Sequence, residues 1–398
     1  MPCKRPISGV AIGSEEGGHR AVDPELGTLA DFRRFVRAAA ALGMEVALDF
    51  AIQAAPDHPW VREHPQWFRF RPDGTIKYAE NPPKKYEDIV NVDFDNPDRE
   101  GLWTELRDTI LFWIGEGVRT FRVDNPHTKP LPFWEWLIRE VKARCPEAIF
   151  LSEAFTRPKM MRALAKSGFT QSYTYFTWRN TKSELIEYLT ELTAYPAKEY
   201  FRPNFFTNTP DILPVFLQEG GRPAFRIRLV LAATLSPVYC IYNGFELCEN
   251  TPIPGREEYL HSEKYEYKVW DWDRAGNIKE DIAVLNRFRR NNSALQEFLN
   301  LRFLNCNDPN ILAYAKISSD RGNVVIIVVN LDPHGAHADT VELPLAELGI
   351  PADAAYSLEE AFTGRAVACR GAYQRFHLEP AINPALVFCL RQPHRINE

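Results

Sequence analysis

The chain has 398 residues, of which 45% are hydrophobic and 25% charged, which is the composition of a soluble globular protein large enough for two or three domains. Lys and Arg number 47 against 53 Asp and Glu, and no basic run occurs, so nucleic acid and anionic membrane surfaces are not expected as partners. The seven cysteines are scattered without a CxxC pair, which argues for reduced thiols and against a disulfide framework.

The sequence lacks the features of a membrane-spanning, secreted or metal-binding protein. No apolar stretch approaches the roughly 18 residues that a membrane span needs, and no signal peptide is recognisable. The nine histidines show no HxxxH or HxH spacing with companion ligands, so no metal site is expected. We therefore predict a cytoplasmic protein without a metal ion or another cofactor.

Helical and strand-like patterns alternate through the first three quarters of the chain. Helices are expected at 28–42, 102–115, 131–144, 182–192, 222–235 and 280–290, and strands at 44–50, 118–123, 148–153, 172–176, 204–208 and 237–242. Such alternation predicts a parallel sheet with right-handed crossovers.

The pattern changes after about Phe298. Val324–Asn330 is typical of a buried strand, Ile311–Ile317 alternates, and turn residues divide the rest up to Cys389. We predict two domains, an α/β domain over 1–298 and an antiparallel β-sandwich over 299–398.

The number of strands before Phe298 bears on the fold class. Six are convincing, whereas a closed (β/α)₈ barrel of the TIM type needs eight. Either two strands are hidden in weak signals such as Ile7–Ile12, or the barrel is incomplete.

Acidic residues stand at the carboxyl ends of several predicted strands, where α/β barrels collect their catalytic groups. Asp49, Asp124 and Glu153 each occupy such a position, and Asp211 follows another strand. Two such acids flanking a glycosidic bond can act as a nucleophile and a general acid with retention of configuration. Asp124, two residues after Arg122, suits an ionised nucleophile, although a structural ion pair is equally consistent with this stretch alone; Glu153, within an apolar segment, suits the acid.

A second cluster lies at 81–86, where Asn81, Lys84 and Tyr86 stand in a Pro-containing stretch read as a loop. These groups are suited to holding a phosphate. Composition alone favours a solvated loop, and no glycine-rich nucleotide motif accompanies it.

The segments Phe121–Pro130, Phe150–Pro158 and Gln171–Asn180 resemble one family, the α-1,4-glucan:maltose-1-phosphate maltosyltransferases, which are bacterial members of the α-amylase clan. The resemblance runs from about Ile12 to the C-terminus. It implies retaining transfer of maltosyl from maltose 1-phosphate to the non-reducing end of an α-1,4-glucan, with release of phosphate, in glycogen or α-glucan biosynthesis.

The resemblance also implies roles for individual residues. Asp124 matches the nucleophile, Glu153 the general acid/base and Asp211 the third acid, which grips sugar hydroxyls. The remaining matches are Arg122 (the arginine two residues before the nucleophile), Gln53 (a position where many amylases have Asn before His), Asn81, Lys84, Tyr86 and Asn125 (the donor phosphate), and Lys264 and Tyr265 (the acceptor path).

One departure from the family pattern concerns the front of the chain. Family members carry a further β-domain used in homodimerisation, and then two barrel strands, before the segment that stands here at 13–19. Strands one and two are therefore expected to be missing, together with the usual dimer surface. Two alternatives stay open: an amylase-like α-glucan hydrolase, and a truncated, catalytically inactive glucan-binding remnant.

Overall fold

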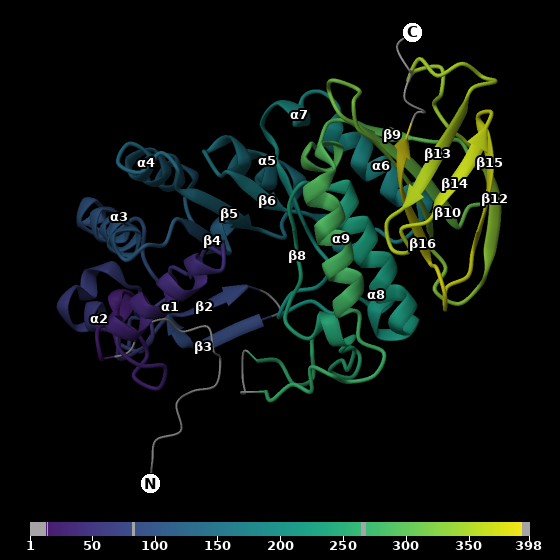
Figure 1. The fold of residues 1–398 in the computed structure, drawn as a ribbon. Helices are drawn as coiled ribbons and strands as arrows, with labels where there is room; N and C mark the ends of the chain where they lie inside the picture. Colours follow the sequence, from purple (N-terminus) through teal and green to yellow (C-terminus); the bar gives the residue numbers. More distant parts are fainter. Residues whose placement is uncertain (1–12, 14, 82–83, 264–267, 392–398) are drawn as a thin grey trace. The chain divides into compact units, whose positions relative to one another are not determined.

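The computed structural model describes residues 13, 15–81, 84–263 and 268–391. The chain divides into two units, the first comprising Met1–Tyr173 and Tyr200–Arg202 and the second Thr174–Glu199 and Pro203–Glu398. Figure 1 shows the elements of both units, which are described here one at a time.

A parallel sheet forms the centre of the first unit. Its strands are β1 (Ala47–Phe50), β4 (Thr120–Asp124), β5 (Ile149–Glu153) and β6 (Gln171–Tyr173), in that spatial order. Each pairs with the next in parallel register. The four strands predicted for this part of the chain are thus confirmed.

Helices connect these strands, and most were predicted. They are α1 (Leu29–Ala41), α2 (Pro59–Glu63), α3 (Arg99–Gly115), α4 (Leu131–Lys142) and α5 (Pro158–Lys166). A capping box between Thr28 and Asp31 sets the start of α1. The short helices α2 and α5 were not expected.

The 3₁₀ turns are brief. They lie at Gly18–Arg20, Pro65–Trp67, Pro126–Thr128, Tyr175–Trp178, Phe245–Leu247 and Ser293–Gln296.

One part of the prediction for the first unit was wrong. The stretch read as a loop at 81–86 belongs largely to an antiparallel pair, β2 (Tyr78–Asn81) and β3 (Lys84–Val90). The two prolines at 82–83 suggested a loop, whereas the flanking residues Tyr78, Tyr86 and Ile89 favour extended backbone.

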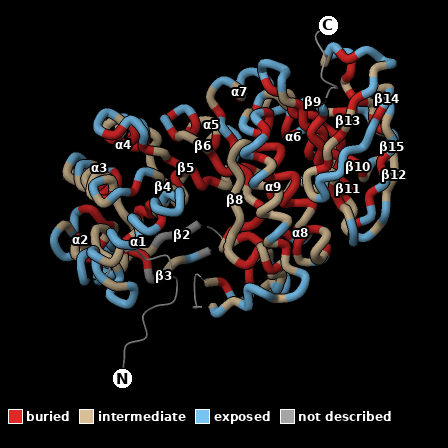
Figure 2. The backbone as a smooth tube through the Cα atoms, in the orientation of Figure 1, coloured by how far each residue is buried: buried red, intermediate tan, exposed pale blue. Residues whose placement is uncertain are grey.

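Side-chain burial in the first unit follows the periodicity of each element. Phe121 and Val123 of β4 are buried, whereas Thr120, Arg122 and Asp124 on the other face are only half-buried. The helices α3 and α4 pack side by side, each burying one apolar face, as the red segments of Figure 2 show. The less buried face of β4 therefore carries its polar side chains.

The second unit contains both α/β elements and a β-rich part. β7 (Pro203–Phe206) pairs in parallel with β8 (Tyr239–Cys240), and both strands were predicted. Its helices are α6 (Lys182–Thr193), α8 (Val215–Leu235) and α9 (Lys279–Asn291); a four-residue helix, α7 (Ala197–Tyr200), ends at the boundary. α8 starts before the predicted Arg222 because its first part joins the rest across a break at Gly221, whose φ is 56°.

The C-terminal strands form two antiparallel sheets. One has the order β14-β13-β16-β11-β10-β9 and the other pairs β12 with β15. The bounds are β9 (Leu301–Phe303), β10 (Ile311–Ile317), β11 (Val324–Asn330), β12 (His337–Glu342), β13 (Ala355–Glu360), β14 (Ala366–Arg370), β15 (Tyr373–Leu378) and β16 (Ala385–Arg391). Side chains from both sheets, among them Ile326, Val341 and Phe376, form one core, so the predicted β-sandwich is confirmed.

The fold class is therefore α/β, with parallel strands of the barrel type followed by an antiparallel sandwich. Four of the six predicted parallel strands lie in the first unit and two in the second. The alternative strand at Ile7–Ile12 falls outside the described residues, and the domain boundary at 298/299 stays a prediction.

Candidate active site

Two carboxylates end adjacent strands of the first unit. Asp124 is the last residue of β4 and Glu153 the last residue of β5, and they are register partners. Neighbouring strands lie about 4.8 Å apart. Retaining glycosidases hold their two carboxyl groups about 5–5.5 Å apart, which is the separation that such neighbours can provide.

Arg122 lies at the centre of the acidic groups. Its Nη1 is 2.7 Å from Asp49 Oδ2 and 4.0 Å from Asp124 Oδ1, and its Nη2 is 3.5 Å from Glu153 Oε1. Its Nε donates to the hydroxyl of Tyr173 at 3.1 Å. The expected pairing of Arg122 with Asp124 is therefore the longest of these contacts, and Asp49, its register partner on β1, is the nearest acid.

The charge balance around Arg122 fixes its protonation. Burial alone would lower its pKa, but the carboxylates of Glu153, Asp49 and Asp124 together raise it. A permanent cation is thus held between the two acids, where it can hold each of them in place without taking part in proton transfer.

Asn125 contacts both candidate catalytic acids. Its backbone N–H donates to Glu153 Oε2 at 3.2 Å, and its Nδ2 donates to Asp124 Oδ1 at 3.4 Å. This requires a left-handed backbone, with φ of 44°, which asparagine tolerates better than most residues.

Two other side chains complete the surroundings of Asp124. Gln53, which follows β1, donates through Nε2 to Asp124 Oδ2 at 2.9 Å. Gln53 Oε1 and His127 Nδ1 are buried and have no hydrogen-bond partner among the described residues. Buried polar atoms are normally paired, so these two are exceptions.

A cavity of about 160 Å³ adjoins these residues. Its polar lining comprises Gln53, Tyr86, Asn91, Asn125, Thr128 and Lys129. The structure thus brings Tyr86 and Asn125, two of the predicted phosphate residues, to one cavity. Asn81 ends β2 and Lys84 begins β3, and their side chains lie outside the described part of the structure.

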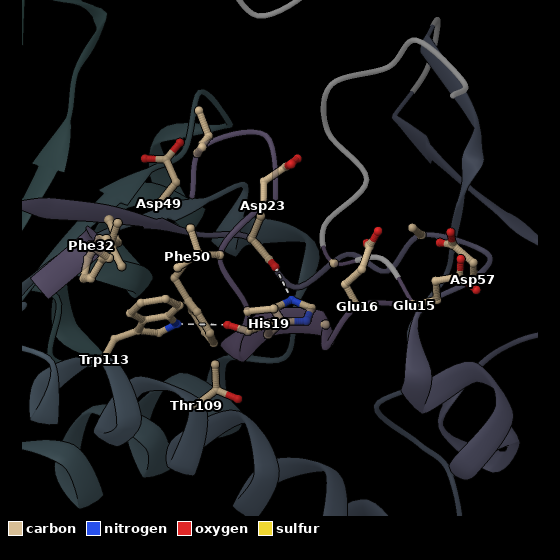
Figure 3. Close-up of a pocket in the computed structure, with 18 of the residues that line it drawn as sticks. Glu15, Glu16, His19, Asp23, Phe32, Asp49, Phe50, Asp57, Thr109 and Trp113 are labelled. Carbon is tan, nitrogen blue, oxygen red and sulfur yellow. Dashed lines mark hydrogen bonds between the residues drawn. The ribbon is translucent and has the colours of Figure 1, made fainter. Parts of the chain in front are cut away.

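A larger cavity of about 700 Å³ has a different chemistry. Figure 3 shows its acidic groups, Glu15, Glu16, Asp23, Asp49 and Asp57, together with the rings of Phe32 and Trp113. No lysine or arginine is among the described residues that line it. It is therefore unsuited to an anionic ligand, and of the two cavities only the smaller one offers a cation.

Histidine 19 forms one wall of the larger cavity and is held from several sides. Its Nε2 is 2.9 Å from the carbonyl oxygen of Ala51, and its own carbonyl oxygen accepts from Trp113 Nε1 at 2.9 Å, as the dashed lines in Figure 3 mark. Its Nδ1 lies 2.9 Å from His58 Nε2.

The structure leaves three predicted site residues untested. Asp211 follows β7 in the second unit, where its backbone N–H donates to Thr209 Oγ1 at 3.2 Å, and its role as the third acid stays a prediction. Lys264 and Tyr265 fall outside the described residues, and their role at the acceptor path also stays a prediction.

Sequence reasoning missed two residues of the site. Tyr173 orients Arg122, and Lys129 lines the cavity beside Asp124. Both lie in the segments that carry the family resemblance, but nothing in their spacing sets them apart from neighbouring residues.

Two other kinds of feature are absent from the described residues. No group of three or more His, Cys, Asp or Glu side chains in this part of the chain is placed to hold a metal ion. Its helices are also all too short or too polar to cross a membrane.

Solved structures of similar shape identify the fold. The α-amylase of Geobacillus thermoleovorans, complexed with acarbose, aligns over 94% of this chain and 84% of its own, with a TM-score of 0.75 and 17% identity. A maltogenic α-amylase from Thermotoga neapolitana, AmyB, aligns over 99% of this chain and 90% of its own, with a TM-score of 0.72 and 19% identity. The chain therefore has the α-amylase fold.

Sequence relatives narrow the class to a family. A family model described as GLGE, C-terminal, matches residues 303–390. The α-1,4-glucan:maltose-1-phosphate maltosyltransferase of Rhodospirillum rubrum is 59% identical over 383 residues, which are 96% of this chain and 56% of the relative. The proteins of the same name from Cereibacter sphaeroides and Myxococcus xanthus are 56% and 54% identical over 98% and 97% of this chain, and 58% of each relative is covered. The chain belongs to this family, and it spans somewhat more than half the length of these relatives.

Proposed function

We propose that this chain carries the catalytic residues of a retaining maltosyltransferase, which moves maltosyl from maltose 1-phosphate to the non-reducing end of an α-1,4-glucan and releases phosphate. The observation that carries the proposal is the pairing of Asp124 with Glu153 at the ends of β4 and β5, with Arg122 between them. The names of the relatives supply the donor and the acceptor.

The first step breaks the bond between the anomeric carbon and the phosphate oxygen. A carboxylate oxygen of Asp124 attacks the anomeric carbon, and phosphate leaves with the bonding electron pair. Glu153 supplies a proton to the departing oxygen. Gln53 and Asn125 hold the Asp124 carboxylate during the attack, because each donates a hydrogen bond to one of its oxygens.

The second step transfers the sugar. Glu153, now ionised, accepts the proton of the acceptor hydroxyl, whose oxygen attacks the anomeric carbon and frees Asp124. Two inversions give net retention. Asp211 is proposed as the third acid, which binds sugar hydroxyls, and Lys264 and Tyr265 as residues of the acceptor path.

An amylase-like hydrolase is the second candidate, favoured by the solved α-amylases that share the fold. In the second step, water attacks in a hydrolase and a glucan hydroxyl attacks in the transferase. A hydrolase would release maltose from an α-glucan or from maltose 1-phosphate.

The decisive experiment incubates the chain with maltose 1-phosphate, with and without a maltooligosaccharide, and measures phosphate, free maltose and the acceptor length. We expect phosphate release that depends on the acceptor, with extension by two glucose units at a time. Free maltose without extension would support the hydrolase. Binding of glycogen without phosphate release, unchanged in Asp124→Ala, would support a glucan-binding role instead.

The biological process and the compartment are proposed from the family as well. We propose a role in glycogen or α-glucan biosynthesis in the cytoplasm, because the name of the relatives gives maltose 1-phosphate and an α-1,4-glucan. No metal ion or cofactor is proposed, and homodimerisation, which the family resemblance implies, stays a proposal.

A further inference from the structure

Lys129 is a lysine that lines the smaller cavity of the site. It lies half-buried between the 3₁₀ turn Pro126–Thr128 and α4, and its Nζ donates to Thr128 Oγ1 at 2.8 Å. Within the described part of the chain, no carboxylate oxygen lies within ion-pair distance of this nitrogen. Burial lowers its pKa to about 8, although the more distant Asp124 acts in the opposite direction.

Such an arrangement is unfavourable unless an anion completes it. A desolvated ammonium group costs free energy when it is not paired, and proteins normally pair such groups. The Thr128 hydroxyl satisfies one of its three donors. Lys129 is therefore prepared for an anionic ligand.

The space beside Lys129 has the dimensions and the donors for a small anion. The cavity of about 160 Å³ is lined by Lys129, Thr128 and Asn125, and by Gln53 and Tyr86 from other elements. Amide, phenol and ammonium donors are the groups that bind phosphate oxygens.

The cavity also adjoins the proposed nucleophile, Asp124. Gln53 and Asn125 line it, and the same two side chains donate to Asp124. A phosphoryl group bound there would bring the anomeric carbon, which is joined to it through one oxygen, next to Asp124.

We infer that Lys129 is a further donor-binding residue, which binds the phosphoryl group of the donor in the cavity beside Asp124. The inference rests on the proposed function, and it adds to the residues that the family resemblance implies, Asn81, Lys84, Tyr86 and Asn125. Lys129 supplies a point charge from the Asp124 side of the cavity, whereas Tyr86 contributes from β3.

A binding measurement tests the inference without turnover. Inorganic phosphate is titrated calorimetrically into the full chain and into Lys129→Met, Lys129→Arg and Lys159→Met, the last of which removes an exposed lysine of α5 in the same unit. We expect Lys129→Met to weaken binding about 10-fold or more, Lys129→Arg to stay within about 3-fold, and Lys159→Met to match the wild type. Equal binding by wild type and Lys129→Met, or no binding by the wild type, would overturn the inference.

A pair of donors separates phosphate binding from structural damage. For maltose 1-phosphate, we expect Lys129→Met to lower kcat/KM about 10-fold or more, mainly through KM. For maltosyl fluoride, whose leaving group carries no phosphoryl, kcat/KM should change by less than about 3-fold. An equal loss with both donors would show that Lys129 acts through the nucleophile or the fold.

The two proposals fail separately. Wild-type chain that binds phosphate through Lys129 but releases none from maltose 1-phosphate would contradict the proposed function and leave the anion site standing. Should Lys129→Met not fold, as judged by circular dichroism, the charge-removing Lys129→Gln and the charge-keeping Lys129→Arg decide the matter.

Discussion

The side-chain amide of Gln53, three residues after the end of β1, donates a 2.9 Å hydrogen bond to Oδ2 of Asp124 at the end of β4. Gln53→Glu would place a second carboxylate there, which would repel Asp124 and misorient it. We expect kcat/KM for maltosyl transfer to fall about 100-fold, and about 10-fold for Gln53→Ala, which only removes the donor. Phosphate release from maltose 1-phosphate measures both.

A matched control for Gln53→Glu is Gln66→Glu, which adds the same charge at an exposed position of the same unit. It should leave kcat/KM unchanged. If Gln53→Glu retained more than half of the wild-type kcat/KM, the hydrogen bond would not serve to orient the nucleophile.

The acid Glu153 serves both steps, but the two steps need it to different degrees. Phosphate is a good leaving group that requires little protonation, whereas the acceptor hydroxyl needs a base. We expect Glu153→Ala to form the maltosyl ester on Asp124 and then stall. Mass spectrometry of the intact chain after mixing with maltose 1-phosphate should show the added maltosyl mass, and peptide mapping should place it on Asp124.

The same variant tests the assignment of roles. Azide, a nucleophile that needs no base, should restore turnover of the stalled ester and, by the second inversion, give maltosyl azide of the α-configuration. An unmodified chain after incubation, or modification at another carboxylate, would contradict the assignment of Asp124 and Glu153.

Periodicity predicted the strand ends well, because the buried faces of β4 and β5 determine which residues point the other way. Asp124, Glu153 and Arg122 could therefore be placed together before any coordinates were known. The partner of Arg122 could not, because the register that sets Asp49 against it depends on the pairing of β1 with β4, whose first residues, Ala47 and Thr120, are 73 positions apart in the sequence.

The cavity beside Asp124 was harder to foresee. Lys129 stands in a loop, and only the fold places Tyr86 of β3 next to it. The Pro82–Pro83 pair suggested a loop where the flanking residues form β2 and β3, because short-range turn signals do not reveal long-range pairing.

Arg122 makes several contacts that a lysine could not reproduce. A guanidinium reaches Asp49, Glu153 and the Tyr173 hydroxyl at once from its separate nitrogens, whereas an ammonium is a single point charge. We expect Arg122→Lys to lower kcat about 100-fold with a smaller change in KM, since both acids lose their orientation. The measurement is initial-rate phosphate release over a range of maltose 1-phosphate concentrations.

Comparison with a weaker perturbation tests this account of Arg122. Tyr173→Phe removes only the hydroxyl that accepts from Nε, and we expect a loss of about 10-fold or less. A larger loss in Tyr173→Phe than in Arg122→Lys would show that the tyrosine acts on the substrate directly.

The pair His19 and His58 should make the first unit sensitive to acid. The backbone N–H of Trp60 donates to His58 Nδ1, so His58 Nε2 carries the proton and donates to His19 Nδ1, and His19 Nε2 in turn donates to the Ala51 carbonyl oxygen. This chain of hydrogen bonds requires both rings to be neutral. Burial lowers the pKa of His19 from 6.5 to about 4, and burial together with the nearby His19 lowers that of His58 to about 3.

Because both folded pKa values lie below the unfolded value of 6.5, the unfolded chain binds more protons below that pH. The free energy of unfolding should therefore be level above pH 6.5 and fall as the pH drops from 6.5 towards 4, by about 3 kcal/mol for His19 alone. Tryptophan fluorescence during urea unfolding at a series of pH values measures this fall. The slope of the free energy of unfolding against pH gives the number of protons that the chain takes up when it unfolds. His58→Gln should lower this number by up to one, whereas His334→Gln, at an exposed position of the second unit, should leave it unchanged. A free energy that stayed level from pH 7 to 4.5 would show that the two rings are not held neutral by the fold.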